Sequence, residues 1–447
     1  MILDAIRRRA RPADHHHLIT GSTVLVVGAA VQALGGSIFW LIAAKLDPQR
    51  QVGAATALFT SVQFVTYLAG LGLPVSLARY SVGRGDDADT TFTWAVIATS
   101  IASVLASIGY LIFLAVDKPP STEALSQGPF GWTVVFTVAV IGSAFSLIVD
   151  VRCMTIRRWN LVLARITIVA IVRLPLVFLI RPDQNPALWL FLFSVLPVAV
   201  TGVIGALAVS RVAGGRLRLG PRPATAGAAV RYSAVNYLST LGYQAPYFAL
   251  PVIVLANVTA RVNASFYVAW GIVAVAFYVP SAIGQALLAE GGKDGVNVEA
   301  QLRLAMLLAG GLMLLGTVAT FVGSSLVTVV YGVQYRDAAR ILPAMMAAGI
   351  PWAITSLYLT EARVLHRHVS TVIITLTLTI AIVIPALVLV PDDGIYGARD
   401  AWVIGNIIAA VVAITAHAIG TQRMRSGRQR EVVDAVAVVP RSPVSPV

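Results

Sequence analysis

Two arginines lie inside one apolar stretch of this sequence, where a charged side chain is costly and therefore most able to do chemistry. Arg165 and Arg173 belong to the run LVLARITIVAIVRLPLVFLI, residues 161–180. A helix of about 20 residues spans the roughly 30 Å hydrocarbon core of a bilayer. A guanidinium near the middle of such a helix costs roughly 2.5–3.5 kcal/mol on insertion scales. We therefore expect Arg173 to face a wet cavity, a partner or an anionic ligand.

The spacing of the two arginines suits an anionic head group. Residues eight apart on an α-helix differ by about 80° around the axis and about 12 Å along it. Guanidinium groups bind phosphate oxygens bidentately, so Arg165 near the cytoplasm and Arg173 near mid-depth could form a ladder for a phosphate. Two alternatives stay open. Arg173 could pair with a polar group between helices and only orient its span, and Arg165 could snorkel to the interface.

Neutral polar side chains in other apolar stretches could line a cavity around such a ligand. Each of them could equally form a hydrogen bond between helices. The candidates are Gln32, Gln63, Asn236, Tyr243, Gln244 and Asn406. His417, near the end of the last apolar stretch, is either a proton site or an interfacial histidine.

Acidic residues avoid the middle of the apolar stretches. Those nearest the membrane are Asp150, Glu290 and Glu361, each at the end of a stretch. A cation-coupled drug exporter normally needs a mid-membrane carboxylate to bind its ion and its cationic drugs. The lack of one in the sequence favours an anionic cargo.

No motif for an enzyme, a metal or a cofactor is present in the sequence. It contains no nucleophile elbow, P-loop or HExxH motif, and the single cysteine, Cys153, excludes an intrachain disulfide and a Cys-based metal site. The acidic residues of the outer loops stand alone, except Asp392 and Asp393, which form a turn in PDDG. A lipid-linked glycosyltransferase would need paired carboxylates or a general base in a larger loop. We expect neither enzymatic activity nor a cofactor, with a membrane-embedded glycan polymerase or ligase as an alternative.

The composition is that of a polytopic membrane protein. The chain is 57% hydrophobic and 12% charged, whereas soluble domains are about 25% charged. We expect an all-α protein with about 12 transmembrane helices. The apolar segments are 19–46, 53–78, 91–116, 130–150, 161–180, 188–210, 232–256, 265–289, 304–330, 341–364, 369–390 and 401–421.

Basic residues predict how the chain crosses the membrane. With the N-terminus in the cytoplasm, most of the 33 Lys and Arg residues fall in cytoplasmic segments, which is the positive-inside pattern. We expect a multi-pass protein of the cytoplasmic (inner) membrane with both termini in the cytoplasm. The net charge of +13 is then mainly a topology signal. Because these arginines are scattered over loops without stacking aromatics, we expect no nucleic-acid partner.

A basic break rich in Gly and Pro divides the chain into two halves. We predict a basic cytoplasmic N-terminus at 1–18, a six-helix lobe at 19–210, a cytoplasmic linker at 211–231, a second six-helix lobe at 232–421 and a disordered cytoplasmic tail at 422–447.

The two halves show a weak parallel repeat. A shift of 211 residues places GAATALFTSVQFVTY (53–67) on ASFYVAWGIVAVAFY (264–278). Two such pseudo-symmetric lobes around a central cavity are typical of alternating-access carriers. The same shift places Arg79 on Glu290, both at the cytoplasmic end of the second helix of their lobe. These charges could form a cytoplasmic gate, or they could be two independent interfacial charges.

Parts of both halves resemble bacterial polysaccharide-biosynthesis flippases of the multidrug/oligosaccharidyl-lipid/polysaccharide (MOP) exporter superfamily. The segments NYLSTLGYQAPYFALPVIVL (236–255) and ASFYVAWGIVAVAFYVPSAIGQALLAEGG (264–292) look like the seventh and eighth spans of that family, with its FY-x-AW run and its AEG end. The segment VGAATALFTSVQFVTYLAGLGLPVSLARY (52–80) is similar to the first half, with a GLGLP-like turn and an Arg-Tyr end.

The resemblance implies a V-shaped pair of six-helix lobes that flips a polyprenyl-diphosphate-linked oligosaccharide for cell-surface polysaccharide, such as lipopolysaccharide. Arg79 and Arg165 would draw the diphosphate from the cytoplasmic leaflet, and Arg173 would hold it at mid-depth. The partners would be the lipid-linked glycan, the bilayer and glycan polymerases or glycosyltransferases, with the protein itself a monomer. A drug exporter of the same superfamily and a non-transporting scaffold are the alternatives.

Overall fold

The computed structural model is built of helices. It describes the backbone of residues 12–74, 77, 86–126, 129–180, 185–212, 226–291, 298–365 and 367–437. Side chains are described for the same residues except 12–26, 29, 86, 126, 210, 212, 226–241, 282, 285–286, 288–291 and 423–437. No strand occurs in these ranges.

The first half of the chain forms six long helices. They are α2 (Pro12–Leu46), α3 (Gln49–Ala69), α5 (Asp86–Asp117), α7 (Gly131–Thr155), α8 (Trp159–Leu176) and α9 (Pro186–Val212). Three short elements lie between them, namely η1 (Pro120–Thr122), α6 (Glu123–Ser126) and η2 (Val177–Leu179).

The second half repeats this pattern with more interruptions. Its elements are α10 (Ala226–Asn257), α11 (Ala260–Gly291), α12 (Val298–Gly323), α13 (Ser325–Tyr331), η3 (Val333–Tyr335), α14 (Arg336–Ala347), α15 (Gly349–Val364) and α16 (His368–Ala437). At Gly394 the backbone has φ 58° and ψ −130°, so α16 is two helices joined at a kink. This kink lies in the PDDG segment that the sequence predicts as a turn, and glycine allows its positive φ.

Within the described residues, nine helical segments are long and apolar enough to cross a membrane, with α16 counted once. The kink at Gly394 divides α16 into two, and Ala30–Leu46, the part of α2 whose side chains are described without a gap, is a further apolar helix. Together with α10 these agree with the twelve spans predicted from hydropathy. The protein is therefore an all-α polytopic membrane protein with two six-helix lobes.

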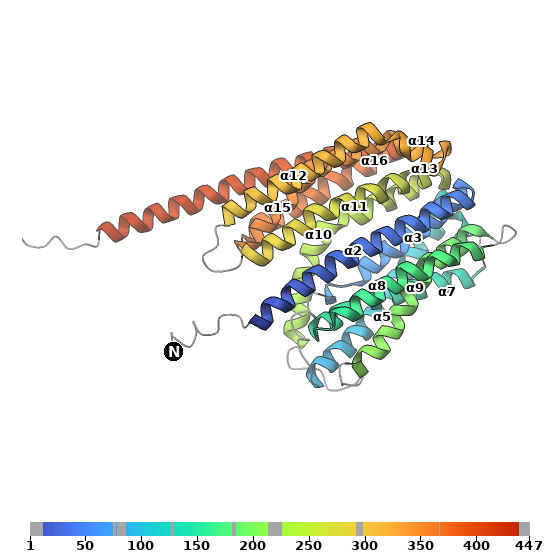
Figure 1. Cartoon of the computed structure of the whole chain (residues 1–447), viewed down its shortest axis with the longest axis horizontal. Helices are drawn as coiled ribbons and strands as arrows, with labels where there is room; N and C mark the ends of the chain where they lie inside the picture. Colours follow the sequence, from blue (N-terminus) through green and yellow to red (C-terminus); the bar gives the residue numbers. More distant parts are fainter. Residues whose placement is uncertain are drawn as a thin grey trace, which may run out of the picture.

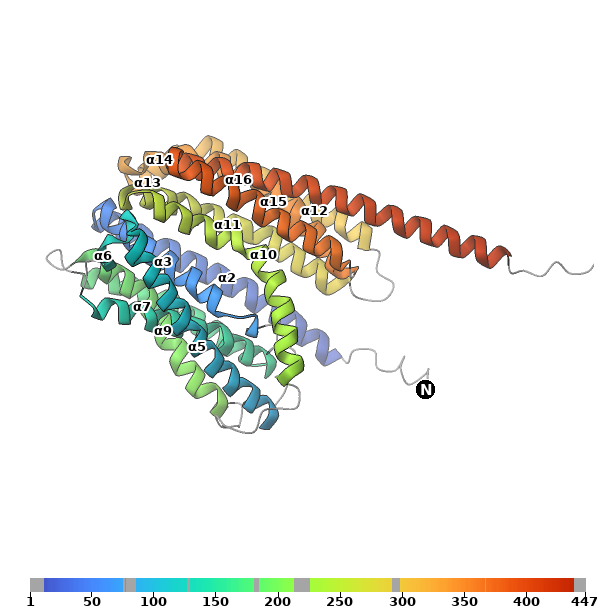
Figure 2. The same cartoon turned by 180° about the vertical axis from the view of Figure 1, so that it is seen from behind.

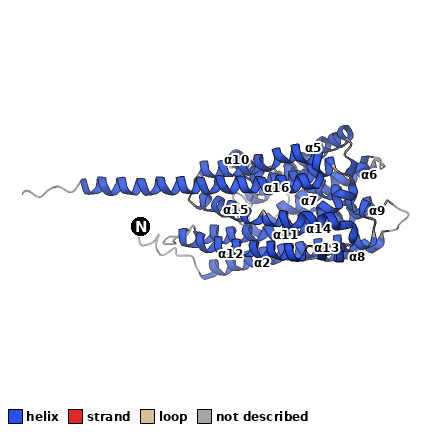
Figure 3. Ribbon diagram, turned by 90° about the horizontal axis from the view of Figure 1, so that it is seen from above, coloured by secondary structure: helices blue, strands red, loops and turns tan. Residues whose placement is uncertain are grey.

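The lobes lie side by side (Figures 1 and 2), and most of their helices run roughly along the long axis of the molecule (Figure 3). Helices α2 to α9 form one lobe, and α11 to α16 form the other (Figure 1). The lobes lie close together at the end where α13 and α14 are, and they diverge toward the end where the described chain begins (Figure 1). Figure 2 shows α10 bending as it passes from the first lobe to the second.

Small residues allow the helices of the first lobe to pack closely. A Cβ at Gly142 of α7 would lie 2.4 Å from the Cα of Ala199 in α9, and a Cβ at Gly202 would lie 2.0 Å from the Gly142 carbonyl oxygen. Small residues at such crossings let backbones approach and gain van der Waals contact. The Ser146 hydroxyl adds a hydrogen bond to the Val198 carbonyl oxygen at 2.9 Å.

A proline inside α10 creates a backbone acceptor that α16 satisfies. Pro246 has no N–H, so it cannot donate to the carbonyl of Gly242, four residues earlier. The hydroxyl of Thr379 in α16 donates to that carbonyl instead. A Cβ at Gly242 would lie 2.5 Å from the Thr375 side chain, so glycine is what allows α16 this close.

Two predicted domain boundaries differ from the observed helices. Helix α10 begins at Ala226, so the last residues of the predicted linker 211–231 are helical. Helix α16 continues to Ala437, into the segment 422–447 predicted as a disordered tail. Both segments are polar, and hydropathy locates apolar spans rather than the full length of a helix.

Candidate functional site

Arg173 is held between α8 and α2 by a close contact of the two helices. A Cβ at Gly35 would lie 2.7 Å from the Ala170 Cβ, so only glycine allows α8 to approach α2 here. The Arg173 side chain is 5% exposed, and its Nη2 donates to the Gln32 carbonyl oxygen at 3.1 Å. Gly36 lies beside the guanidinium, where a Cβ would be 3.6 Å from Nη2. The sequence of α2 thus leaves room for the charge.

The charge of Arg173 is not neutralised by any acid in the part of the chain that the structure describes. No salt bridge to it occurs there, and its Nε has no hydrogen-bond partner among the described atoms. A buried donor without a partner costs about 1–3 kcal/mol, and more when the group is charged. The guanidinium therefore keeps unused capacity to bind an acceptor.

Arg173 faces a cavity of about 360 Å³ between the lobes. The wall comes from α2, α3 and α8 of the first lobe and from α11 and α13 of the second. Its polar and aromatic lining residues are Gln32, Ser37, Trp40, Phe59, Gln63, Arg173, Tyr267, Tyr278 and Tyr331. Gln32 and Gln63 thus lie where the sequence predicts, and no Asp or Glu is among the described lining residues.

A second cavity of about 220 Å³ adjoins the first on the side of the second lobe. The two share Ala274 and Tyr278 of α11. The lining residues of the second cavity are Tyr243, Gln244, Tyr247, Phe248, Ala274, Phe277, Tyr278, Ser281 and Trp352. Gln244 and Tyr243 are therefore lining residues too, and the combined space joins a cationic wall to an aromatic one.

Arg165 lies elsewhere, in a side-chain pair with Asp150. Its Nε donates to Asp150 Oδ1 at 2.7 Å and its Nη2 donates to Oδ2, which ties α8 to α7. Arg165 is absent from the described lining of both cavities. The predicted ladder of Arg165 and Arg173 is therefore not formed in this structure, because a carboxylate already occupies the Arg165 fork.

The remaining predicted site residues divide into two groups. Asn406 is fully buried and donates to the Trp402 carbonyl oxygen of its own helix at 2.8 Å, so it lines neither cavity. Arg79 and the side chains of Asn236 and Glu290 lie outside the described residues. The gate predicted between Arg79 and Glu290 stays a prediction.

The lobes contact each other where α3 and α11 begin. A Cβ at Gly53 would lie 1.5 Å from the Ala260 carbonyl oxygen, a distance that no larger residue tolerates. The Asn263 amide donates to the Gly53 carbonyl oxygen at 2.9 Å and to the Thr56 hydroxyl at 3.3 Å. The two helix starts are thus pinned together across the lobe boundary.

Further hydrogen bonds join the lobes at the same end. Gln49 Nε2 lies 3.0 Å from both Ser265 Oγ and the Gln334 carbonyl oxygen. The Ser121 hydroxyl donates to the Val258 carbonyl oxygen at 2.6 Å. These contacts close one end of the space between the lobes.

A buried acid and a histidine meet within the second lobe. Glu361 of α15 is 5% exposed, and its Oε2 lies 2.5 Å from Nδ1 of His417 in α16. The Tyr358 ring lies against the His417 ring at 4.5 Å. The sequence shows both residues at the ends of apolar stretches, but nothing in it indicates that they meet, since 56 positions separate them.

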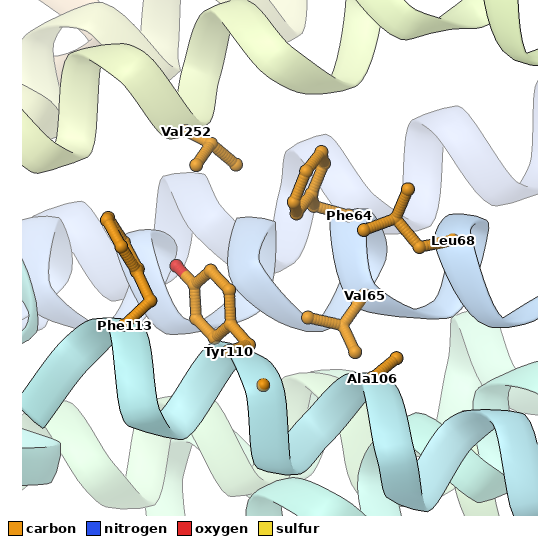
Figure 4. Close-up of a pocket in the computed structure, with 8 residues that line it drawn as sticks. Phe64, Val65, Leu68, Ala106, Tyr110, Phe113 and Val252 are labelled. Atoms are coloured by element: carbon orange, nitrogen blue, oxygen red, sulfur yellow. The ribbon is translucent and has the colours of Figure 1, made fainter.

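An apolar pocket lies on another side of α3, between α5 and α10 (Figure 4). Its lining residues are Phe64, Val65, Leu68, Ala106, Gly109, Tyr110, Phe113 and Val252. The hydroxyl of Tyr110 is bonded to Ser61 Oγ at 2.6 Å, so it offers little to a ligand. No group of three or more His, Cys, Asp or Glu that could hold a metal occurs in the described residues.

No protein-family model matches the sequence, and no curated protein matches it significantly. Solved structures of transport proteins are nevertheless similar in fold. The lipid II flippase MurJ in an inward closed conformation has a TM-score of 0.71 at 12% identity, over 89% of this chain and 87% of that one. A multidrug resistance MATE family transporter of the MOP superfamily, in an inward-facing conformation, has a TM-score of 0.65 at 16% identity, over 91% of this chain and 99% of that one.

A third similar structure is described by the polarity of its own binding pocket. It is a MOP superfamily transporter from Pyrococcus furiosus Vc1, described by a reverse polarity of its binding pocket that suggests a different function. Its TM-score is 0.60 at 16% identity, over 92% of this chain and 96% of that one. The chain thus has the fold of MOP superfamily transporters. All three similar proteins are transport proteins rather than enzymes.

Proposed function

We propose that this protein flips a polyprenyl-diphosphate-linked oligosaccharide across the cytoplasmic membrane by alternating access between its two lobes. The single observation that carries the proposal is Arg173, a guanidinium with an unused Nε that faces the space between the lobes. A diphosphate matches its fork in charge and geometry. A cationic drug would be repelled by it, and the described lining holds no carboxylate to attract one.

The other lining residues suit the glycan part of such a cargo. Ligand sites combine apolar and aromatic walls with a few well-placed polar groups. Here Trp40, Tyr267 and Tyr278 offer flat apolar faces, while Gln32 and Gln63 offer amide donors and acceptors. Sugar rings have apolar faces and hydroxyl rims, so both kinds of group have a use. The polyprenyl chain would stay in the bilayer beside the lobes.

The contacts between the lobes support alternating access as the mechanism. With both termini in the cytoplasm, as the sequence predicts, the end pinned by Asn263 and Gly53 would face outward and the diverging end would face the cytoplasm. The structure would then be the form that accepts cargo from inside. Rocking would break the outer contacts and bring the inner ends together, where Arg79 and Glu290 are the candidates for a gate.

Neutralising Arg173 tests the function. In cells that encode this chain, Arg173→Gln should abolish export of the glycan, and lipid-linked glycan should accumulate on the cytoplasmic side at unchanged protein level. Arg303→Gln is the matched control, because Arg303 lies exposed in a surface pair with Glu299 on α12. Normal export by a correctly folded Arg173→Gln protein would refute the role. Lengthened glycan made by the purified protein would instead indicate a polymerase.

A cation-coupled drug exporter is the second candidate. The buried Glu361 beside His417 favours it, because a protonatable pair inside a lobe could couple transport to an ion. Deleting the gene distinguishes the two candidates. Greater drug sensitivity without glycan accumulation would support drug export, whereas accumulation of lipid-linked glycan supports the flippase.

A further inference from the structure

A second cation, Arg363, lies on the other lobe, outside the lining of the second cavity but against one of its lining residues, Tyr243. Trp352 of α15 lines the second cavity, and Ser356, one turn later, is 3.3 Å from the hydroxyl of the lining residue Tyr243. Residues 11 apart on an α-helix differ by only about 20° around the axis. Arg363 therefore lies on the same face of α15 as Trp352, about 17 Å nearer to the diverging end.

The position of the Arg363 side chain agrees with this helical register. Its Cζ lies over the Tyr243 ring, 5.5 Å from the centroid. A guanidinium at this distance is attracted to the ring, which holds it beside the lining residue Tyr243. The Tyr243 ring also stacks on the Trp352 ring, with the two ring centroids 5.4 Å apart. The aromatic wall thus leads from Arg363 toward the shared part of the two cavities.

Arg363 keeps its charge available. Its side chain is exposed, and no salt bridge to it occurs among the described residues. The nearest acid along the chain, Glu361, points to another side of α15 and is engaged by His417 at 2.5 Å. Arg165, by contrast, is occupied by Asp150. Arg363 is therefore free to act together with Arg173.

We propose that Arg363 is a second binding residue for the phosphate anion of the cargo, at the mouth of the cavity on the second lobe. The anion meets Arg363 first and then Arg173, which lies deeper on the first lobe. The two cavities between these positions are lined in part by four tyrosines, namely Tyr243, Tyr247, Tyr267 and Tyr278. This inference rests on the proposed function, since it assumes a phosphate-bearing cargo.

Binding of tritiated farnesyl diphosphate to the purified full-length protein tests it. Arg363→Gln should raise the Kd about ten-fold, as expected for loss of one charge-assisted contact. The Kd of Arg363→Lys should lie between those of the wild type and Arg363→Gln, because an ammonium keeps the charge but cannot bind phosphate bidentately. Arg173→Gln should also weaken binding, and Arg303→Gln should leave it unchanged. Melting temperatures should match the wild type.

The outcomes distinguish failure of the role of Arg363 from failure of the proposed flippase function. If Arg173→Gln weakens binding and Arg363→Gln does not, only the role of Arg363 is overturned. If farnesol binds as tightly as farnesyl diphosphate, the proposed cargo class itself is overturned. Equal competition by inorganic pyrophosphate would show a site for the free anion and would also overturn a lipid-linked cargo.

A second measurement uses only the wild-type protein, so it does not depend on whether the Arg363 variants fold. In the wild-type protein, bound farnesyl diphosphate should slow modification of Arg363 by an arginine-selective dicarbonyl reagent, read by peptide mass spectrometry. The exposed Arg303 should react at an unchanged rate. Modification of Arg363 at the same rate with and without farnesyl diphosphate would overturn the proposal.

Discussion

The side-chain amide of Asn263 donates to the backbone carbonyl of Gly53 at 2.9 Å, although the two residues lie 210 positions apart and on different lobes. The pair joins the first turns of α3 and α11, the two helices that the internal repeat superposes. Because Gly53 has no Cβ, the α11 backbone can approach within hydrogen-bonding distance. This end of the cavity can open only if the bond breaks.

Fixing this contact should therefore stop transport. Gln49 and Ser265 lie next to it, with Nε2 and Oγ 3.0 Å apart. In a Gln49→Cys, Ser265→Cys double variant, a short reducible bifunctional thiol reagent should join the lobes and abolish export, and reduction should restore it. The native Cys153 is buried, so its background reaction should be low. Each single-cysteine variant is the control, and continued export by crosslinked protein would contradict an opening at this end.

Breaking the pair of Arg165 and Asp150 should affect folding rather than cargo binding. Arg165→Gln leaves Asp150 without its partner between α7 and α8. These side chains are 15% and 17% exposed. The free energy of unfolding should therefore fall by roughly 2–3 kcal/mol, somewhat less than for a fully buried pair. Thermal unfolding of the purified protein measures it. Binding of farnesyl diphosphate to the folded fraction should stay at the wild-type level, in contrast to Arg173→Gln.

The pair also shows where prediction from the sequence stops. Hydropathy located all the spans because each apolar run must cross the same hydrocarbon thickness. It also placed Arg165 and Arg173 in one apolar span, α8. It could not give the direction in which each faces, since the rotation of a span depends on its neighbours. Gly35 and Ala170 set the packing of α8 against α2, which turns Arg173 to the cavity.

Arg363 illustrates the same limit from the other side. In the sequence it is one of many basic residues near the cytoplasmic ends of spans, and positive-inside counting gives all of them the same meaning. Only the register of α15, with Trp352 and Ser356 on one face, and the contact with Tyr243 distinguish it. Helical register along α15 could have suggested that face, but not that Tyr243 lies opposite it.

Removing the Thr379 hydroxyl, which donates to the Gly242 carbonyl oxygen of α10, should destabilise the second lobe. Thr379→Val leaves the Gly242 carbonyl without the donor that replaces the N–H missing from Pro246. An unsatisfied buried acceptor costs about 1–3 kcal/mol. Thermal unfolding should show this loss. Thr377→Val is the control, because the Thr377 hydroxyl makes no hydrogen bond within the described residues.

A double variant makes this explanation specific. Pro246→Ala restores an N–H that can donate to Gly242 within α10, so Thr379→Val should cost less in that background. A double-mutant cycle should therefore show coupling of about 1 kcal/mol, within the range for residues in contact. Additive effects of the two substitutions would mean that Thr379 acts through packing alone.

Filling the apolar pocket beside α3 should slow the motion of the lobes. Helices α3 and α5 belong to the first lobe and Val252 to α10, so the pocket changes shape when the lobes rock (Figure 4). A Cβ at Gly109 would meet no atom within 4 Å, so Gly109→Leu adds an apolar side chain without a clash at its first carbon. Such filling typically adds about 0.5–2 kcal/mol to stability. We expect a higher melting temperature together with slower export.

The matched control for this substitution is Gly310→Leu on α12. A Cβ there also meets no atom within 4 Å, and α12 is a span of the second lobe that contributes to none of the three pockets. Gly310→Leu changes helix propensity by the same amount, since both replace glycine by leucine inside a helix. Export by Gly310→Leu should therefore equal that of the wild type. Equal slowing by both variants would show that helix stiffness, rather than occupancy of the pocket between the lobes, limits the rate.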